Sequence, residues 1–186
     1  QASSLDQELI EDYGLTDIQA KLFSLRGINT AEKLDFWLNA DENDLADPFL
    51  MHDMEKSINR INQAIDNGEK ITIYGDYDAD GITSTALMYE VLQDVGANVN
   101  YYVPNRFRDG YGPNAEAYQK IIDQGTTLII TVDNGVSGKA VIDPVIKQGI
   151  DVIVTDHHEM PEDLPNAYAI VHPRYPGSNY PFTDLS

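Results

Sequence analysis

The spacing of apolar residues changes near residue 68. Before this point, apolar side chains recur every three or four positions, which is the period of an amphipathic helix. The clearest run has four on one predicted face: Met54, Ile58, Ile61 and Ile65. Residues that favour helix N-caps precede three of the runs: Thr16, Thr30 and Asp53. Residues 1–67 are therefore predicted to form a helical segment.

After residue 68, short runs rich in β-branched residues alternate with helical stretches. The predicted strands are residues 70–74, 98–103, 127–132, 151–155 and 167–171. This alternation indicates right-handed βαβ units in an α/β fold. We predict a mostly parallel, doubly wound sheet with helices on both faces, preceded by the helical segment. The domain spans residues 68–186, and its helix over 137–149 is expected to be interrupted near Pro144.

Charge and composition narrow the possible functions. The formal net charge is −19, from 31 acidic and 12 basic residues, which argues against a simple phosphate-binding surface. A solvated surface explains most of this excess, but some acids are candidates for metal ligands. The chain has no cysteine, which excludes disulfides and thiolate metal sites and fits a cytoplasmic location. No stretch reaches the roughly 20 apolar residues of a membrane span, so no membrane partner is expected.

Acidic residues and histidines follow three of the predicted strands. The carboxyl ends of parallel strands share one edge of a sheet, where ligands bind. We therefore expect three segments that are distant in sequence to meet in space. They contribute Asp76, Asp78 and Asp80 after the first strand, Asp133 after the third, and Asp156, His157 and His158 after the fourth.

This set of oxygen and nitrogen donors suits hard or borderline divalent cations such as Mn²⁺ or Mg²⁺. Asp80 alone could serve only as a helix N-cap, but capping does not explain three acidic strand ends together with two adjacent histidines. Single histidines are more often structural than ligands, so His52 and His172 receive little weight.

Several common motifs are excluded. Asp76, Asp78 and Asp80 match the opening of an EF-hand loop, but Leu87 stands where that loop needs its bidentate glutamate. A predicted strand also precedes the motif, where an EF-hand has a helix. The sequence contains no phosphate-loop or dinucleotide fingerprint and no nucleophile elbow.

Five stretches together resemble the DHH phosphoesterase superfamily, and within it the RecJ family of single-strand-specific exonucleases. The triplet that gives the superfamily its name stands here at residues 156–158. The stretches are "IYGDYDADGITSTALMYEVL", "YYVPNRFRDGYGPN", "LIITVDNGVSG", "VIVTDHHEMP" and "AIVHPRYPGSNYPFTDLS". The likeness covers about residues 45–186, and the order and spacing of its motifs make it specific.

The resemblance implies a doubly wound catalytic domain that binds two divalent cations, usually Mn²⁺ or Mg²⁺. It implies that Asp78 and Asp80 are ligands on opposite sides of the pair and that Asp133 bridges the two ions. His157 would bind one ion, and Asp156 would orient the cluster. The candidate metal ligands are thus Asp76, Asp78, Asp80, Asp133, Asp156 and His157, with Asp76 as a ligand or as a partner of the ligands.

The catalytic residues implied by the resemblance are Asp78, Asp80, Asp133, His157 and His158. His158 would lie close to the scissile phosphate, with Arg106 and Arg174 as further substrate contacts. Tyr101, Tyr102 and Tyr111 are candidates for stacking on bases, although Tyr101 or Tyr102 is more simply a core strand residue.

The implied function is metal-dependent phosphodiester hydrolysis, from 5′ to 3′ on single-stranded DNA, in repair and recombination. Partners would be single-stranded DNA and, in the full-length protein, a single-strand-binding protein and a helicase. Family members carry a further metal-binding aspartate motif downstream, for which Asp184 is no substitute. We therefore expect the sequence to be part of a longer protein, truncated at the C-terminal end of this domain and inactive alone.

Three alternatives stay open. Another DHH phosphoesterase would act on oligoribonucleotides or cyclic dinucleotides. A haloacid-dehalogenase-like phosphatase would explain Asp78 and Asp80 after a strand, but gives no reason for the two histidines. A non-catalytic interaction fragment would use residues 1–67 as its contact surface, although every motif position within the chain is intact.

Overall fold

The computed structural model describes residues 5–107, 110 and 112–185. The chain divides into two compact units, Gln1–Leu45 and Ala46–Ser186. Among the described residues, no helix combines the length and apolar character needed to cross a bilayer.

The first unit is a small helical body. It contains α1 (Gln7–Asp12), α2 (Asp17–Leu25), α3 (Ala31–Asn39) and the short 3₁₀ helix η1 (Glu42–Asp44). Thr16 and Thr30 cap α2 and α3 as predicted, because their side chains accept hydrogen bonds from the backbone N–H groups of Gln19 and Lys33. The helices enclose a core of Leu5, Ala20, Ile28 and Leu34.

The second unit is an α/β domain. Its elements are η2 (Pro48–Leu50), α4 (Met54–Asp66), β1 (Lys70–Tyr74), α5 (Ala79–Asp94), β2 (Asn98–Tyr102), α6 (Ala115–Asp123), β3 (Leu128–Val132), α7 (Lys139–Ile146), β4 (Asp151–Thr155) and β5 (Ala169–Val171). The described residues form a sheet of five strands in the order β2-β1-β3-β4-β5. Every pair of neighbouring strands is parallel.

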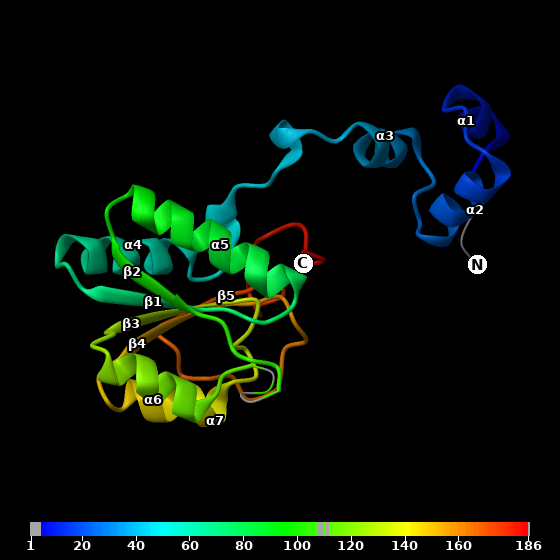
Figure 1. Cartoon of the computed structure of the whole chain (residues 1–186). Coiled ribbons are helices and arrows are strands. Elements are labelled where there is room, and N and C mark those ends of the chain that lie inside the picture. The colour runs from blue at the N-terminus through cyan, green and yellow to red at the C-terminus, as the bar shows by residue number, and fades with distance from the viewer. Residues whose placement is uncertain (1–4, 108–109, 111, 186) are drawn as a thin grey trace. The chain divides into compact units, whose positions relative to one another are not determined.

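Helices cover both faces of this sheet. Figure 1 shows α4 and α5 on one face and α6 and α7 on the other. Alternate strand residues point into two cores. Ile71 and Ile73 pack with Leu92 of α5, whereas Tyr74 packs with Tyr118 of α6. The prediction of a doubly wound sheet preceded by helices is confirmed. Strands β1 and β3 flank the topological switch point, where ligands bind in open sheets of this order.

Helix α4 packs with the sheet, although its helical period grouped it with the preceding segment in the sequence. Its buried residues are Ser57, Arg60 and Ala64, while Ile58 on the predicted apolar face is 39% exposed. Helix α4 is held against the sheet because the Arg60 guanidinium reaches Glu69 at 2.7 Å and Asp151 at 2.6 Å. These ion pairs fix the helix to the amino ends of β1 and β4.

Two other local expectations were wrong. Asp53 precedes α4 but does not cap it with its side chain; its carboxylate instead accepts a hydrogen bond from the Ile170 N–H of β5 at 3.1 Å. Helix α7 is not interrupted, because it continues through Pro144 to Ile146. The turn beyond the proline closes when the Lys147 N–H donates to the Asp143 carbonyl.

Candidate metal centre

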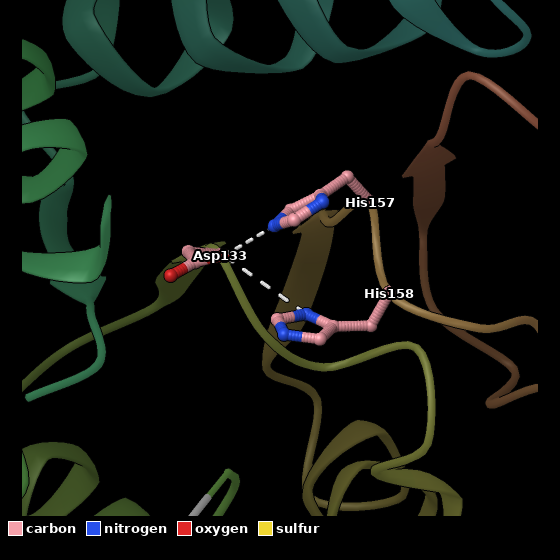
Figure 2. A group of neighbouring side chains, drawn as sticks. All are labelled: Asp133, His157 and His158. Atoms are coloured by element: carbon pink, nitrogen blue, oxygen red, sulfur yellow. Dashed lines mark hydrogen bonds and ion pairs between the residues drawn. The ribbon is translucent and has the colours of Figure 1, made fainter. Parts of the chain in front are cut away.

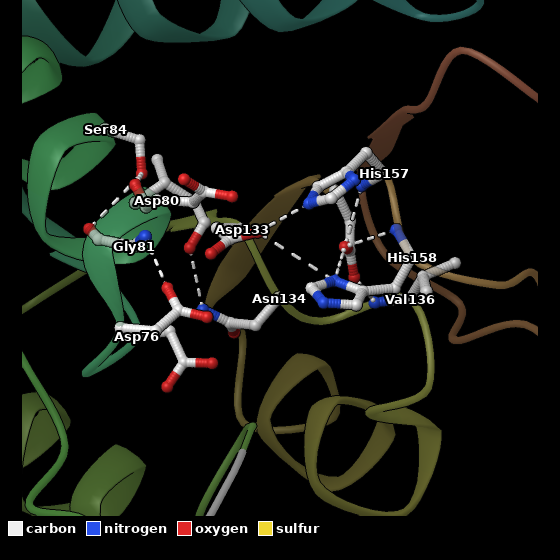
Figure 3. Close-up of polar contacts among 12 residues, drawn as sticks. Asp76, Asp80, Gly81, Ser84, Asp133, Asn134, Val136, His157 and His158 are labelled. Carbon is white, nitrogen blue, oxygen red and sulfur yellow. Dashed lines mark hydrogen bonds and ion pairs between the residues drawn. The ribbon is translucent and has the colours of Figure 1, made fainter. Parts of the chain in front are cut away.

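The segments that follow β1, β3 and β4 meet at the carboxyl edge of the sheet (Figures 2 and 3). Their side chains form two groups whose candidate ligand atoms lie within 4.8 Å of one another. One group is Asp76, Asp78 and Asp133, and the other is Asp133, His157 and His158. Asp133 therefore belongs to both groups and lies between them.

The loop after β1 places two carboxylates by different means. Asp76 is fully buried, and its Oδ1 accepts a hydrogen bond from the Tyr77 N–H at 2.6 Å. Asp78 is the N-cap of α5, because its Oδ1 accepts from the Gly81 N–H at 2.9 Å. A Cβ on Gly81 would lie only 2.6 Å from the Asp76 Cβ, so a glycine is needed for α5 to begin this close to Asp76.

These environments move the two pKa values in opposite directions. Burial raises the pKa of Asp76. The hydrogen bond from the Gly81 backbone lowers the pKa of Asp78. Asp78 therefore holds its negative charge readily next to a carboxyl group whose charge is costly.

Asp133 is the most constrained residue of the site. Its backbone has a φ of 61°, in the left-handed region that residues other than glycine rarely adopt. Burial raises the pKa of Asp133 to about 6, against the lowering effect of the hydrogen bond to His157. The negative charge of Asp78 adds to the increase.

Asn134 links the two strands that flank the switch point, although no sequence pattern predicted this role. Its buried side-chain amide donates to the carbonyls of Tyr74 and Gly75, at 3.2 and 3.0 Å, and of Val132 at 2.9 Å. The amide thereby links the end of β1 to the end of β3, which sets the separation of the carboxylates that follow these strands. The only sequence signal was its position directly after Asp133.

Asp156 uses both carboxylate oxygens to hold the histidine pair. Its Oδ2 accepts from the Val136 N–H at 2.8 Å. Its Oδ1 interacts with the His157 N–H at 2.7 Å, the His158 N–H at 3.1 Å and the His158 Nδ1 at 2.7 Å. Hydrogen bonds therefore engage both oxygens, and Asp156 lies outside the two ligand groups.

The two histidines face Asp133 from the loop after β4 (Figure 2). The His157 Nε2 lies 2.9 Å from the Asp133 Oδ1, and the His158 Nδ1 lies 3.9 Å from the same oxygen. Burial lowers the pKa of His158, but the hydrogen bond to Asp156 and the surrounding carboxylates outweigh it and leave this pKa raised. His158 is thus favoured as a cation.

The site contains carboxylate oxygens that protein groups do not satisfy. Among the described residues, the buried Oδ2 atoms of Asp76 and Asp133 have no hydrogen-bond partner. Such orphaned acceptors are costly unless a cation or another partner compensates them. Both atoms belong to residues of the ligand groups, and the donors are oxygen and imidazole nitrogen. The residues present therefore fit Mn²⁺ or Mg²⁺.

The two histidines line two different cavities. A cavity of about 710 Å³ is lined by Asp80, Asp133 and His157, and by apolar side chains such as Leu87 and Val91. A second, of about 360 Å³, is lined by His158 and the small residues Gly112 and Gly138. Asp80 is exposed in the first turn of α5 and lies outside both ligand groups, although it shares the first cavity with Asp133.

The remaining predicted substrate contacts, Arg106 and Arg174, make contacts with other residues. The Arg106 guanidinium lies over the ring of Tyr77, 5.5 Å from the ring centroid. Tyr77 directly follows Asp76 in the chain. The Arg174 guanidinium donates to the Thr183 carbonyl at 3.1 Å and to Asp184 at 3.2 Å.

The predicted stacking tyrosines pack largely on the domain itself. Tyr102 stacks on Tyr74, and the half-exposed Tyr101 meets Tyr89 edge-on. Tyr111 lies outside the described residues.

His172, given little weight from the sequence, contacts the backbone of the histidine pair. Its side chain is completely buried, and its Nε2 lies 2.8 Å from the His158 carbonyl oxygen. The available signal was its place directly after a predicted strand, at the same edge of the sheet as the other site residues.

Comparison with known proteins identifies relatives for most of the chain. Residues 70–181 match the DHH family, N-terminal domain. The single-stranded-DNA-specific exonuclease RecJ of Bacillus subtilis (strain 168) is 46% identical over 180 residues, which are 97% of this chain and 23% of that protein.

Solved structures agree with this result. The crystal structure of exonuclease RecJ bound to manganese has a TM-score of 0.66 and 30% identity, covering 76% of this chain and 35% of that one. The structure of RecJ from Thermus thermophilus in complex with Mn²⁺ has a TM-score of 0.66 and 26% identity, covering 92% of this chain and 24% of that one. The chain spans about a quarter of the length of the curated relatives it matches, 23% to 29% for the first five.

Proposed function

This chain belongs to the DHH family, and from this premise we propose that it forms the metal-binding part of an exonuclease acting on single-stranded DNA from the 5′ end. The observation that carries the proposal is Asp133, which is shared by two ligand groups and has a buried oxygen that no described protein group satisfies. The names of the relatives support the substrate, and their manganese-bound structures support the metal.

Two divalent cations, Mn²⁺ or Mg²⁺, would occupy the two ligand groups. Asp76, Asp78 and Asp133 would hold one ion, and Asp133 and His157 would hold the other, with Asp80 approaching from the shared cavity. When bound, such a pair activates water and stabilises the attacking and leaving oxygens of a phosphodiester. Asp133, the residue that both groups share, has a left-handed backbone conformation.

His158 would contact the scissile phosphate. Asp156 binds its Nδ1, so the imidazole presents its opposite edge away from Asp156, and the raised pKa favours the cation that attracts phosphate oxygens. Arg106 would add a second cationic contact from the loop beside Tyr77. We retain Arg174 as a more distant candidate, because its guanidinium is engaged with Asp184.

This arrangement accounts for nucleic-acid chemistry on a chain with a net charge of −19. The acids of the site would be compensated by bound cations, and these cations would attract the substrate phosphates. A broad basic surface is therefore not required next to the scissile bond.

The wider biological setting remains a prediction. Roles in DNA repair and recombination, a cytoplasmic location, and a single-strand-binding protein and helicase as partners follow from the resemblance and from the composition of the sequence. Co-purification with the full-length protein tests the two proposed protein partners directly.

The experiment that tests the proposed activity uses the full-length protein with Mn²⁺. Single-stranded and duplex DNA labelled at either end, and a dinucleotide, are offered as substrates. We expect mononucleotides released from the 5′ end of the single strand. Asp78→Ala should lower the rate by at least about 10²–10³-fold, the scale of losing a central electrostatic group, whereas Asp94→Ala at the exposed end of α5 should not. Hydrolysis of the dinucleotide alone, or activity that survives Asp78→Ala, would contradict the proposal.

A further inference from the structure

The loop that carries the histidine pair has little regular structure of its own. Residues 156–168 connect the parallel strands β4 and β5, and within these described residues no helix forms. Parallel strands are usually joined through a helix, and loops of this length without one are uncommon and often functional. The positions of His157 and His158 therefore depend on side-chain contacts, made by Asp156 within the loop and by residues outside it.

His172 provides one of these contacts from the end of β5. Its Nδ1 accepts a hydrogen bond from the Arg174 N–H at 3.0 Å. Because a backbone N–H can only donate, the Nδ1 carries no proton and the Nε2–H of the neutral ring donates to the His158 carbonyl at 2.8 Å. Both ring nitrogens are thus used, and the ring is fully buried, so His172 has no nitrogen left for a metal ion.

We propose that His172 is a positioning residue that fixes the peptide of His158 and thereby the aim of the His158 ring. The inference rests on the function proposed above, in which His158 contacts the scissile phosphate. With His172, the residue is held at three points. Asp156 engages the backbone N–H and the ring Nδ1 of His158, and His172 engages its carbonyl oxygen.

Each of these three contacts restrains a different motion. The Asp156 carboxylate holds the N-terminal side of His158 and one edge of its ring. Without His172, the peptide plane on the C-terminal side of His158 would lose this hydrogen bond, and its carbonyl would face the buried site without this donor. Without this anchor the loop beyond His158 could shift, and a displaced Cα would carry the ring away from the geometry set by Asp156.

A purely structural histidine would behave differently. A buried ring that only fills space can be replaced by another ring of similar size with modest effect. A positioning ring requires the donor toward His158, so an aromatic ring without nitrogen should fold but fail in catalysis. Partners outside the ligands of a site are typically worth about 10–100-fold in activity.

The test compares four full-length proteins with Mn²⁺ on single-stranded DNA: wild type, His172→Phe, His172→Asn and His52→Phe. Phenylalanine keeps the ring volume without hydrogen bonds, and asparagine keeps a donor and an acceptor. His52 stacks on Tyr175 away from the ligand groups and serves as the matched control. We expect H172F to lower kcat about 10–100-fold with KM within about twofold of wild type, H172N to recover to within a few-fold, and H52F to match wild type.

A second readout does not depend on activity. In a crystal structure of H172F, we expect the distance between His158 Nδ1 and Asp156 Oδ1 to lengthen from 2.7 Å to beyond hydrogen-bonding distance. If H172F does not fold, His172→Leu replaces it with the same expectations. An unchanged distance, a kcat within twofold of wild type, or equal losses in the Phe and Asn variants would overturn the inference. Inactivity of wild type and H52F together would instead overturn the proposed function.

Discussion

Asp133 shows how a single residue can combine strain, burial and unbalanced charge. Its φ is 61°, its Oδ2 has no described partner, and burial raises its pKa to about 6. Each feature costs stability in the metal-free protein. Together they are expected of a residue retained for a ligand rather than for folding.

Asp133→Asn distinguishes the effect of the Asp133 charge on the stability of the metal-free protein from its role in binding Mn²⁺. At pH 7.5 the variant removes a buried negative charge that faces Asp78, so the metal-free protein should melt higher. The increase should be about 2–4 °C for each kcal/mol of repulsion removed in a chain of this size. The same variant should lose the increase in Tm that Mn²⁺ gives wild type. Thermal melts with Mn²⁺ and with a chelator measure both effects, and an Mn²⁺-induced increase that persists in Asp133→Asn would contradict the assignment.

Arg106 provides a second test at the residue scale. If its guanidinium contacts a substrate phosphate, Arg106→Ala in the full-length protein should raise KM for single-stranded DNA about tenfold, the effect of one charge-assisted hydrogen bond. Its kcat should change little, because Arg106 lies outside the ligand groups. Lys147→Ala, at the far end of α7, is the control. An unchanged KM would remove Arg106 from the substrate contacts.

Some of the site residues could be predicted from the sequence, and others could not. Asp76, Asp133 and His157 follow apolar strands, and parallel strands place their carboxyl ends together whatever the details of packing. Asn134 and His172 were missed because their importance depends on which carbonyls their side chains reach. The carbonyls of Tyr74 in β1 and of His158 in the loop after β4 are distant from these residues in sequence, and their proximity appears only when the chain is folded.

At the scale of elements, the ends of the strands and the start of α5 create the site, while α4 supports the sheet from its opposite end. The period of the strands and helices was sufficient to predict the doubly wound fold. It did not predict that α4 packs on the sheet, because arginine is usually exposed to solvent and the burial of Arg60 is not evident from the sequence. Its partner Asp151 is 91 positions away.

The Arg60 network gives the stability of the domain a defined pH dependence. The hydrogen bond from Arg60 holds the pKa of Glu69 below its ordinary value of 4.5. A carboxyl whose pKa is lower in the folded state stabilises the protein above its unfolded pKa, and this stabilisation is lost as the pH falls through the folded value. The contribution should therefore be full at neutral pH and vanish in the acid range below 4.5.

Glu69→Gln tests this dependence. The variant should be less stable than wild type by about 1 kcal/mol at pH 7 and pH 5, since its partner Arg60 is buried but Glu69 is partly solvated. The difference should shrink below about pH 4.5. Chemical denaturation across this range measures it, with the exposed Glu90→Gln as control. A difference that grows on acidification would show that the ion pair does not stabilise the fold.

At the scale of the whole molecule, the chain is two compact units joined near Leu45. Helical period alone placed the boundary at residue 67, because it does not show which body a helix packs against. Helix α4 joins the second unit through its contacts with β5 and through Arg60.

Limited proteolysis tests the observed division. Residues 40–45 are exposed, and their only regular structure is η1 (Glu42–Asp44), so a glutamate-specific protease should cut first at Glu42. A fragment that begins near residue 43 should then persist. Mass spectrometry identifies the first products. Early cleavage at Glu116, in the first turn of α6, would show that the second unit is the less stable one.

The most direct test of the central claim is anomalous scattering at the manganese edge from crystals soaked in Mn²⁺. We expect two peaks about 3.5–4 Å apart. One should lie among Asp76, Asp78 and Asp133, and the other beside Asp133 and His157. A map with no peak within coordination distance of Asp133 would show that this residue is not a metal ligand.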